Sequence, residues 1–426
     1  MRPTTKIFAI ALLSATALAA LPNAASATNG MNPICYGTDN CGMGGAGVSV
    51  GKNTAGAILN PALSGRTGRE VMVSVGWLHA DVSGEVRNTQ NLNGAGNHAG
   101  KQDSKASDFA DGTLALNWRF NDQWSANLAA FPGGGGATNW EKPRTNAGAG
   151  GDHQIRTRYM FIQPSASYTP AQDKDWSFGA GVVISRQDMK TDSLSNNFSN
   201  ARPGPRESVD VAWGAGFHLG TVWQPSEVFS VGASYRSPIW AEKYSNYANI
   251  FAGPMNMPQQ FIIGISGKPS LVPKLTLAGD IKYIDWQSVG AIGRDPAGDQ
   301  ARPAANNADN GGFGWKSQFV FLVGGAYDVS DKFTVRAGYN YGKSPIDEMH
   351  VFANFLFPAI TEHHLTAGAS YKLTERYEIG GSAYWSPEIT LANHPEGSTA
   401  TFANQGGNTY LSHQQYGAQA SLKVKF

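Results

Sequence analysis

Residues 416–426 read YGAQASLKVKF, and the alternation in this stretch decides the fold of the chain. The even-numbered positions carry Tyr, Ala, Ala, Leu, Val and Phe, whereas the odd-numbered positions carry Gly, Gln, Ser, Lys and Lys. Because successive side chains of a strand point to opposite faces, the pattern predicts a strand with one apolar and one polar face, ending on an aromatic residue. A surface strand of a soluble sandwich alternates in the same way, so the rest of the chain has to distinguish the two folds.

The same alternation recurs along most of the chain. Similar runs cover 71–77, 114–120, 124–130, 160–168, 176–184 and 209–219, or begin near residues 228, 258, 274, 316, 332, 362 and 377. With the C-terminal run the count is fourteen strands. An even number is what a closed bacterial barrel requires.

The connections between these runs alternate in length. Short ones lie at 121–122, 170–174, 224–226, 268–273, 329–331 and 374–375, and long ones at 81–110, 132–154, 188–206, 238–257, 287–314, 343–360 and 391–409. Short periplasmic turns and long extracellular loops are typical of outer-membrane barrels. We therefore predict an all-β fold, a 14-stranded antiparallel transmembrane β-barrel over residues 67–426. The aromatic residues at strand ends predict interfacial girdles; these are Trp118, Trp124, Trp176, Trp223, Trp286 and Trp385.

The first 27 residues have the organisation of a secretory signal peptide. Arg2 and Lys6 precede an apolar run over 7–21, and Ala25-Ser26-Ala27 forms a cleavage site. Charged residues make up 15% of the chain, below the roughly 25% of an ordinary soluble domain. The net charge of +1 gives no indication of a nucleic-acid partner. We expect a monomeric, multi-pass protein of the Gram-negative outer membrane.

Residues 42–62, GMGGAGVSVGKNTAGAILNPA, have neither strand nor helix periodicity and cannot build a core of their own. We predict that residues 28–66 form a plug inside the barrel, with Asn60, Pro61 and Ala62 as the hinge between plug and wall. Cys35 and Cys41 lie close together in an exported chain, which favours a small disulfide loop. The glycines also spell G-x-G-x-x-G, but no strand precedes them, so a dinucleotide site is not expected.

The third predicted strand meets Pro132 directly after Phe131 and then the run Gly133, Gly134, Gly135 and Gly136. Proline gives no N–H to a ladder and glycine favours kinks and bulges. Two interpretations stay open: Pro132 begins an extracellular loop, or this segment leaves a gap in the barrel wall.

Five basic residues lie on, or just beyond, polar strand faces: Arg158, Arg186, Lys282, Lys316 and Arg336. In a lumen with an apolar pocket one of them would hold a carboxylate by charge-assisted hydrogen bonds, or would pair with a lumen carboxylate such as Asp210 or Asp280. No catalytic constellation or metal-ligand cluster is evident. We expect no enzymatic activity, no cofactor and no metal.

Three segments resemble the FadL family of long-chain fatty acid transporters, which includes toluene and xylene porins. They are residues 44–62 with the NPA sequence, 274–286 (KLTLAGDIKYIDW), and 333–387 with RAGYNYGKSP, FPAITEHHLTAGASYKL and YEIGGSAYWSP. The resemblance implies a barrel plugged by an N-terminal hatch. It also implies that hydrophobic substrate enters from outside and leaves sideways at the third strand after a hatch change.

The resemblance assigns the lateral gate to residues 131–136 and substrate-carboxylate roles to Arg186 and Lys316, beside the candidate Arg158. The Phe in this gate precedes Pro132, whereas in the family it follows the Pro. Expected partners are a hydrophobic small molecule, outer-membrane lipid or lipopolysaccharide, and the barrel assembly machinery through Phe426. Fatty acids and neutral hydrocarbons both stay open as substrates. The alternatives to a channel for hydrophobic molecules are a water-filled porin for small polar solutes and, less favoured, an outer-membrane adhesin or enzyme.

Overall fold

The computed structural model describes residues 29–51, 53–86, 100–141, 153–191, 209–247, 253–295, 312–393 and 409–426. The predicted signal peptide, residues 1–27, lies outside the described residues. Among the described residues, no helix is long and apolar enough to cross a membrane.

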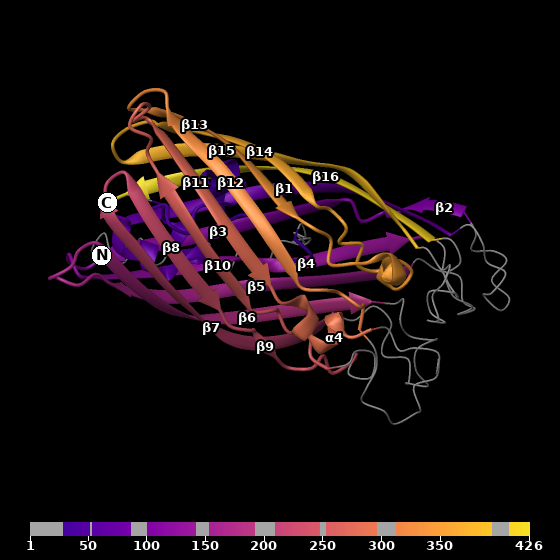
Figure 1. Ribbon diagram of the computed structural model, residues 1–426. Helices are drawn as coiled ribbons and strands as arrows, with labels where there is room; N and C mark the ends of the chain where they lie inside the picture. Colours follow the sequence, from indigo (N-terminus) through magenta and orange to yellow (C-terminus); the bar gives the residue numbers. More distant parts are fainter. Residues whose placement is uncertain are drawn as a thin grey trace, which may run out of the picture.

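One antiparallel sheet closes on itself to form a barrel (Figure 1). Fourteen strands pair in succession around the ring, and β1 closes it by pairing with β16. The ring strands are β1 (Glu70–Val86), β3 (Asp108–Arg119), β4 (Trp124–Trp140), β5 (His153–Tyr168), β6 (Trp176–Thr191), β7 (Asp210–Ser226), β8 (Phe229–Arg236), β10 (Gln260–Gly267), β11 (Leu275–Ile284), β12 (Gln318–Asp328), β13 (Phe333–Gly342), β14 (His363–Lys372), β15 (Tyr377–Ala392) and β16 (Thr409–Lys425). Two short strands, β2 (Gly100–Asp103) and β9 (Trp240–Ala241), pair with β1 and β7. The predicted fourteen-stranded barrel is confirmed.

Burial alternates along the strands in the sense opposite to that of a soluble domain. On β6, Phe178, Val182 and Ile184 are exposed on the outer face, whereas Ser185 and Gln187 are completely buried inside. Apolar surface of this extent around a whole barrel is unfavourable in water and favourable against lipid. The strand pattern therefore places lipid outside and polar side chains in the lumen.

The two ends of the barrel differ as the sequence predicts. The short turns lie at the end that carries the C-terminus, whereas long connections leave the other end (Figure 1). Around these long connections lie η2 (Trp286–Ser288), α4 (Gly290–Gly293), η3 (Glu348–His350) and η4 (Ala353–Phe355). The short-turn end is the periplasmic one in outer-membrane barrels.

Two predictions about individual positions are wrong. The third ring strand does not end at Phe131, because β4 continues through Pro132 and the glycines to Trp140, held by β5 along its whole length. Trp286 does not belong to an interfacial girdle. Its side chain is fully buried, donates to Gln318 (3.0 Å) and packs edge-on against Trp315.

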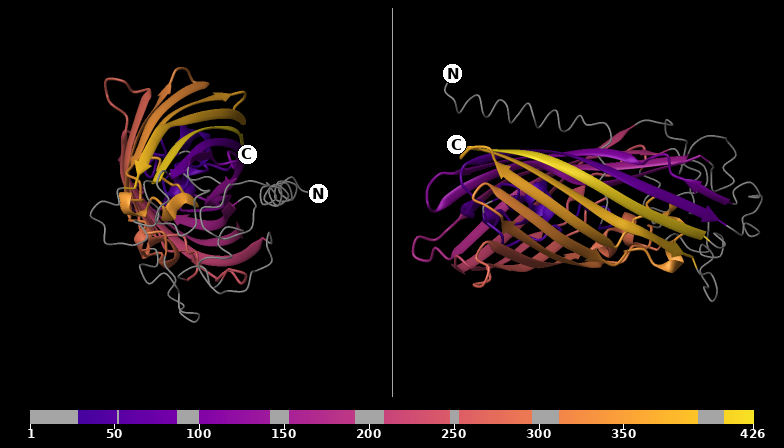
Figure 2. Two further views of the ribbon diagram at one scale, coloured as in Figure 1. Left: turned by 90° about the vertical axis from the view of Figure 1, so that its right-hand side faces the viewer. Right: turned by 90° about the horizontal axis from the view of Figure 1, so that it is seen from above.

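Residues 29–51 and 53–66 lie inside the ring, as the end-on view shows (Figure 2). We call them the N-terminal segment. They include α2 (Gly37–Gly42), α3 (Gly56–Leu59) and η1 (Pro61–Arg66). Helix α2 packs against β13–β16 and η1 against β3–β7, so the segment touches opposite sides of the wall. Met31, Val48 and Ile58 supply apolar contacts that this small-residue chain could not build alone.

Candidate functional site

Strands β3 and β4 separate halfway along the wall. Their register stops at the pair Leu114–Ala130, although β3 goes on pairing with β1 and β4 goes on pairing with β5. Ladder pairing between β3 residues 108–113 and β4 residues 131–138 is therefore absent from the wall. We call this interval the β3–β4 window. Backbone groups without ladder partners are costly against lipid and are tolerated where they line a cavity.

The window is closed at its upper border, toward the long connections, and is bounded by a β-bulge at its lower border, toward the short turns. Beyond it the amide of Lys105 donates to the carbonyl of Asn139 (2.7 Å). At its lower border the β4–β5 register shifts between Pro132 and Gly134, so that one extra residue lies in β4. A bulge of this kind bends the strand that carries it and increases its local twist.

The glycines of β4 bring its backbone against the N-terminal segment. Gly134 and Gly135 have φ values of 144° and 153°, which favour glycine. The Gly135 amide donates to the carbonyl of Met31 (3.1 Å). A Cβ on Gly134 would lie 2.2 Å from that same carbonyl oxygen, and one on Gly133 would lie 2.5 Å from the Phe161 ring. The inner side of the window is thus closed by Met31, and only glycine permits the contact.

A small apolar cavity of about 50 Å³ lies directly inside the window. Phe109 of β3 and Ala137 of β4, one from each edge of the window, line it together with Met31 and Phe357. No Lys, Arg, Asp or Glu is among the described residues that line this cavity. The arrangement suits an uncharged apolar group.

Phe131 connects the lower border of the window to α2. Its completely buried ring packs edge-on against Tyr36, with the ring centres 5.0 Å apart. The Arg236 guanidinium lies 5.7 Å from the centre of the Phe131 ring and donates to the Ile58 carbonyl (2.7 Å). Tyr36 and Ile58 both belong to the N-terminal segment. Phe131 and Arg236 therefore contact it from the wall.

Helix α2 is held to the opposite wall by a buried ionic group. Asp39 pairs with Lys423 of β16 and with Arg336 of β13 (3.1 Å), and Lys423 also binds Glu378 of β15 (2.7 Å). Burial opposes the charge on Asp39, but Lys423 and Arg336 together hold the pKa of this carboxyl below its ordinary value. Asp39 is therefore ionised at neutral pH.

Backbone amides of the glycine-rich stretch make a second anchor. The Asp280 carboxylate accepts hydrogen bonds from the amides of Gly47 (2.7 Å) and Val48 (2.9 Å). A Cβ on Gly44, where φ is 69°, would lie 2.6 Å from the backbone nitrogen of Tyr339. The glycines that spell a dinucleotide motif thus allow the chain to lie directly against the barrel wall.

The NPA sequence is attached to the wall on the other side. Asn60 donates to the carbonyl of Thr221 (3.0 Å) and accepts from the amide of Ala62 (3.1 Å), while Pro61 begins η1. A Cβ on Gly220 would lie 2.0 Å from the Asn60 side-chain oxygen. These contacts make residues 60–62 an attachment point. Their role as a hinge stays a prediction.

The two cysteines form a loop around α2. Cys35 and Cys41 are joined by a disulfide, with their Cα atoms 4.9 Å apart. The bridge encloses Asp39 and the start of α2, which keeps this short helix together.

The predicted substrate-binding residues do not gather in the lumen. Arg158 and Arg186 share the outer face of β5 and β6 with Ile162 and Ile184, and both bind Asp188 there. Lys316 precedes β12 at the loop end, where it is 47% exposed and lies 3.8 Å from Asp295. The assignment of Arg158, Arg186 and Lys316 to a lumen carboxylate site is therefore corrected.

Lys282 and Arg336, also considered from the sequence, do face the lumen. Lys282 is 3% exposed on β11, and Arg336 is engaged by Asp39. Arg236, which contacts both Phe131 and the N-terminal segment, was not anticipated. The alternation of β8 predicts its position in the lumen, because Ser230, Ser234 and Arg236 share the polar face of this strand.

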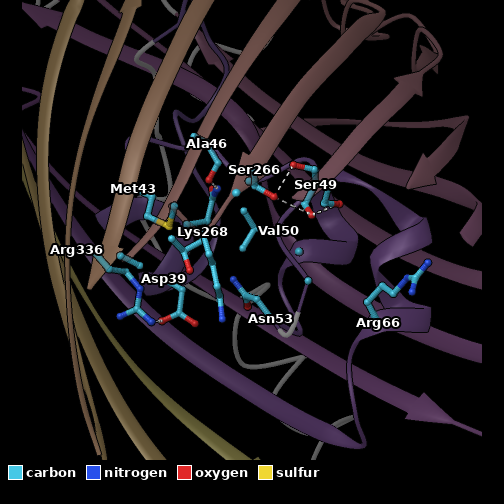
Figure 3. Close-up of a pocket in the computed structure, with 18 of the residues that line it drawn as sticks. Asp39, Met43, Ala46, Ser49, Val50, Asn53, Arg66, Ser266, Lys268 and Arg336 are labelled. Carbon is cyan, nitrogen blue, oxygen red and sulfur yellow. Dashed lines mark hydrogen bonds and ion pairs between the residues drawn. The ribbon is translucent and has the colours of Figure 1, made fainter. Parts of the chain in front are cut away.

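A polar cavity of about 430 Å³ lies below the N-terminal segment at the short-turn end (Figure 3). Charged side chains from the wall and from the segment line it, among them Asp39, Arg66, Lys268 and Arg336. It is wide enough for several water molecules. The N-terminal segment thus separates a polar cavity at the periplasmic end from the apolar cavity at the window.

We expect Asp39→Asn to weaken the docking of α2 by about 1–3 kcal/mol, because Lys423 and Arg336 each lose a buried charge partner. Hydrogen exchange of the α2 amides in detergent measures this as lost protection. Since the pKa of Asp39 is lowered, its contribution is present above the ordinary carboxyl pKa and is lost as pH falls through the lowered value. Asp122→Asn, at a turn where the side chain is 83% exposed, is the matched control. Equal protection in both variants would contradict the anchoring role.

A closed fourteen-stranded barrel with an apolar outer face, an occupied lumen and an interrupted wall defines a transport barrel of the outer membrane. The chain belongs to the family described as outer membrane protein transport protein (OMPP1/FadL/TodX), whose model matches residues 19–421. Membership of this family makes it an outer-membrane transport protein.

Solved structures of the same fold cover almost the whole chain. The P. putida toluene transporter TodX is 16% identical with a TM-score of 0.66, covering 92% of this chain and 99% of that one. A Pseudomonas aeruginosa FadL homologue is 17% identical with a TM-score of 0.66, covering 94% and 100%. The Ralstonia pickettii toluene transporter TbuX is 16% identical with a TM-score of 0.62, covering 92% and 99%.

A curated relative in sequence is the 47 kDa outer membrane protein of Pasteurella multocida (strain Pm70). The two are 21% identical over 215 residues, 46% of each chain, so the match spans about half the length of that relative.

Proposed function

We propose that the protein is a passive channel for hydrophobic molecules, without chemistry or energy coupling. Substrate enters from the extracellular side, reaches the apolar cavity and leaves sideways into the bilayer through the β3–β4 window. The observation that carries the proposal is the interrupted pairing of β3 and β4 directly outside an apolar cavity. A sideways route never returns an apolar solute to water, so it avoids the cost of rehydration.

The size of the cavity requires movement during transport. A cavity that holds benzene measures about 150 Å³, whereas this one measures about 50 Å³. Met31 lines this cavity, and its carbonyl accepts the hydrogen bond from the Gly135 amide of the window strand β4. Withdrawal of Met31 and the residues after it would enlarge the cavity and uncover the window. The N-terminal segment is in this proposal a hatch.

The attachment of residues 60–62 to β7 supports a particular form of that movement. Asn60 is fixed to the wall at Thr221, so the hatch residues before it swing while η1 stays in place. This assigns Asn60, Pro61 and Ala62 the hinge role within the hatch, residues 28–66, of which the part before Asn60 moves. The gate is assigned to Phe131, Pro132 and the four glycines that follow.

The uncharged lining of the cavity favours a neutral substrate, or the apolar tail of an amphiphile, at the window. Three relatives of the same fold are named as transporters of toluene or channels for monoaromatic hydrocarbons. We therefore propose small neutral hydrocarbons as the first substrate class and fatty acids as the second.

The remaining partners follow from the barrel. A complete ring needs no second copy to close, which supports a monomer. Phe426 follows β16 directly and packs against Trp118 at 5.4 Å between ring centres. This aromatic pair at the short-turn end supports recognition by the barrel assembly machinery.

The test compares uptake of labelled toluene, oleate and a sugar by cells with and without the protein. We expect protein-dependent uptake of toluene, and of oleate if acyl chains also pass, with no change for the sugar. Protein-dependent uptake of the sugar alone would establish a water-filled porin and overturn the proposal.

A further inference from the structure

Two polar side chains interrupt the apolar lining of the cavity inside the window. His413 and Gln415 both belong to β16, and because they are two positions apart they lie on the same, buried face of this strand. In the register they stand opposite Val82 and Ala80 of β1, which line the same cavity. The cavity therefore has a polar side on β16, whereas residues such as Phe109 form the apolar remainder.

The contact that His413 makes determines which of its ring nitrogens is left over. Its Nδ1 lies 2.8 Å from the carbonyl oxygen of Pro358. Since a carbonyl only accepts, Nδ1 carries the hydrogen, and Nε2 of the neutral ring is then an acceptor. A charged ring would need a carboxylate partner, and no carboxylate of the described residues lines the cavity. The buried Nε2 atom has no hydrogen-bond partner among those residues either.

Gln415 supplies a second acceptor. Its amide nitrogen lies 3.4 Å from Nε2 of His364 on β14. An amide nitrogen only donates, so this contact leaves the amide oxygen, Oε1, for another partner. Oε1 is buried, and no described residue donates to it. Because buried acceptors are nearly always satisfied, two of them beside one cavity require an explanation.

The chemistry of the two acceptors discriminates between classes of ligand. A pure hydrocarbon leaves both acceptors without a donor. A carboxylate has no hydrogen to donate and would bring a charge against two acceptors. An ammonium group could donate, but it would be a buried charge in a cavity that no described carboxylate lines. A hydroxyl group donates one hydrogen bond and carries no charge, so it satisfies an acceptor without that cost.

We propose that His413 and Gln415 recognise the hydroxyl group of an otherwise apolar, neutral ligand such as a phenol or an alcohol. The hydroxyl donates to His413 Nε2 or to Gln415 Oε1, and the hydrocarbon part lies against Leu78, Phe109 and Phe357. This inference rests on the proposed function, because the ligand fits only after the N-terminal segment has withdrawn and enlarged the cavity.

The test measures binding of three probes to the full protein in detergent, by equilibrium dialysis against empty micelles. The probes are p-cresol, p-xylene, in which a methyl group replaces the hydroxyl, and 4-methylanisole, whose oxygen cannot donate. In His413→Asn/Gln415→Leu the asparagine amide retains a donor toward Pro358, while both free acceptors are removed. We expect this variant to bind p-cresol at least about tenfold more weakly and to lose no affinity for the other two probes.

Gln419→Leu is the matched control, since it makes the same change on the same face of β16 outside the cavity lining. It should keep the affinity for p-cresol. Gln415→Met retains the length of the side chain without its amide, and we expect a smaller but still selective loss of p-cresol binding. Heat-modifiable migration on SDS gels verifies that each barrel is folded.

Equal losses for all three probes, or unchanged p-cresol binding in the folded variants, would overturn the proposal. Such a result is distinguishable from a failure of the proposed function. Dialysis involves no transport step, whereas the uptake of toluene by cells is measured separately and does not depend on a hydroxyl group.

Discussion

Deleting Gly133 together with Pro132→Val is expected to reduce hydrophobe uptake to the level of cells that lack the protein, while the barrel still folds. Pro132 pairs with Met160 and Gly134 with Tyr159, so Gly133 is the extra residue of the bulge. Its removal leaves every other β4–β5 pair as it is. The register with β3, which now stops at Leu114–Ala130, can then continue upward, and valine supplies the N–H that proline lacks.

A second bulge provides the matched control. The β7–β8 register shifts by one residue between Trp223 and Ser226, and β5 and β6 stand between β7 and the window strand β4. Deleting Pro225 removes that bulge in the same way. We expect this control to keep its uptake of labelled toluene. A folded Gly133-deleted, Pro132→Val barrel that still transports at the normal rate would show that substrate does not pass between β3 and β4.

The strands of the barrel were predictable because each one carries its own two-residue alternation. Residues 416–426 show it without any knowledge of their neighbours, and β16 indeed covers them nearly to the end. The continuation of β4 past Pro132 was not predictable in the same way. Proline and four glycines are locally unfavourable for a strand. They remain in one because β5 pairs with them as far as His153, an interaction distant in sequence.

The misplaced arginines show a different limit. Arg158 has the same parity as Met160 and Ile162, and Arg186 the same parity as Ile184, so the alternation itself places both on the outer face. The positive charge of these side chains suggested a site in the lumen. Their even-numbered positions, shared with the exposed isoleucines, indicated the lipid-facing side instead, and the structure places them there. For charged residues near strand ends, the outer face lies at the headgroups rather than in hydrocarbon.

The contacts of the window depend on residues that the sequence does not bring together. Met31 lies about a hundred residues before Gly135, and the hydrogen bond between them joins backbone atoms, so neither side chain predicts it. Phe357 reaches the same cavity from a connection between β13 and β14. The glycines near Gly134 predicted an irregular wall. Their positive φ values and the close approach of Met31 arise from tertiary packing.

Cross-linking the N-terminal segment to the wall is expected to abolish uptake reversibly. The hydroxyl oxygens of Ser49 in the segment and Ser266 of β10 are 3.0 Å apart. Cysteines at both positions are therefore close enough for a disulfide. If hatch movement is required, oxidised Ser49→Cys/Ser266→Cys should lose toluene uptake, and a reductant should restore it, because the bond fixes the segment beside the Asp280 anchor.

Thr390→Cys/Ser412→Cys is the control for this cross-link. It joins β15 to β16 within the wall, where the two hydroxyl oxygens are 2.7 Å apart, and leaves the N-terminal segment free to move. Because a reductant also acts on the native Cys35–Cys41 bridge, its effect on the control is subtracted. Mass spectrometry of tryptic peptides measures how completely each bond forms. Normal uptake by a fully cross-linked Ser49→Cys/Ser266→Cys protein would mean that the segment stays docked on β10 during transport. Movement would then be confined to the residues around Met31, which lines the apolar cavity and contacts β4 at Gly135.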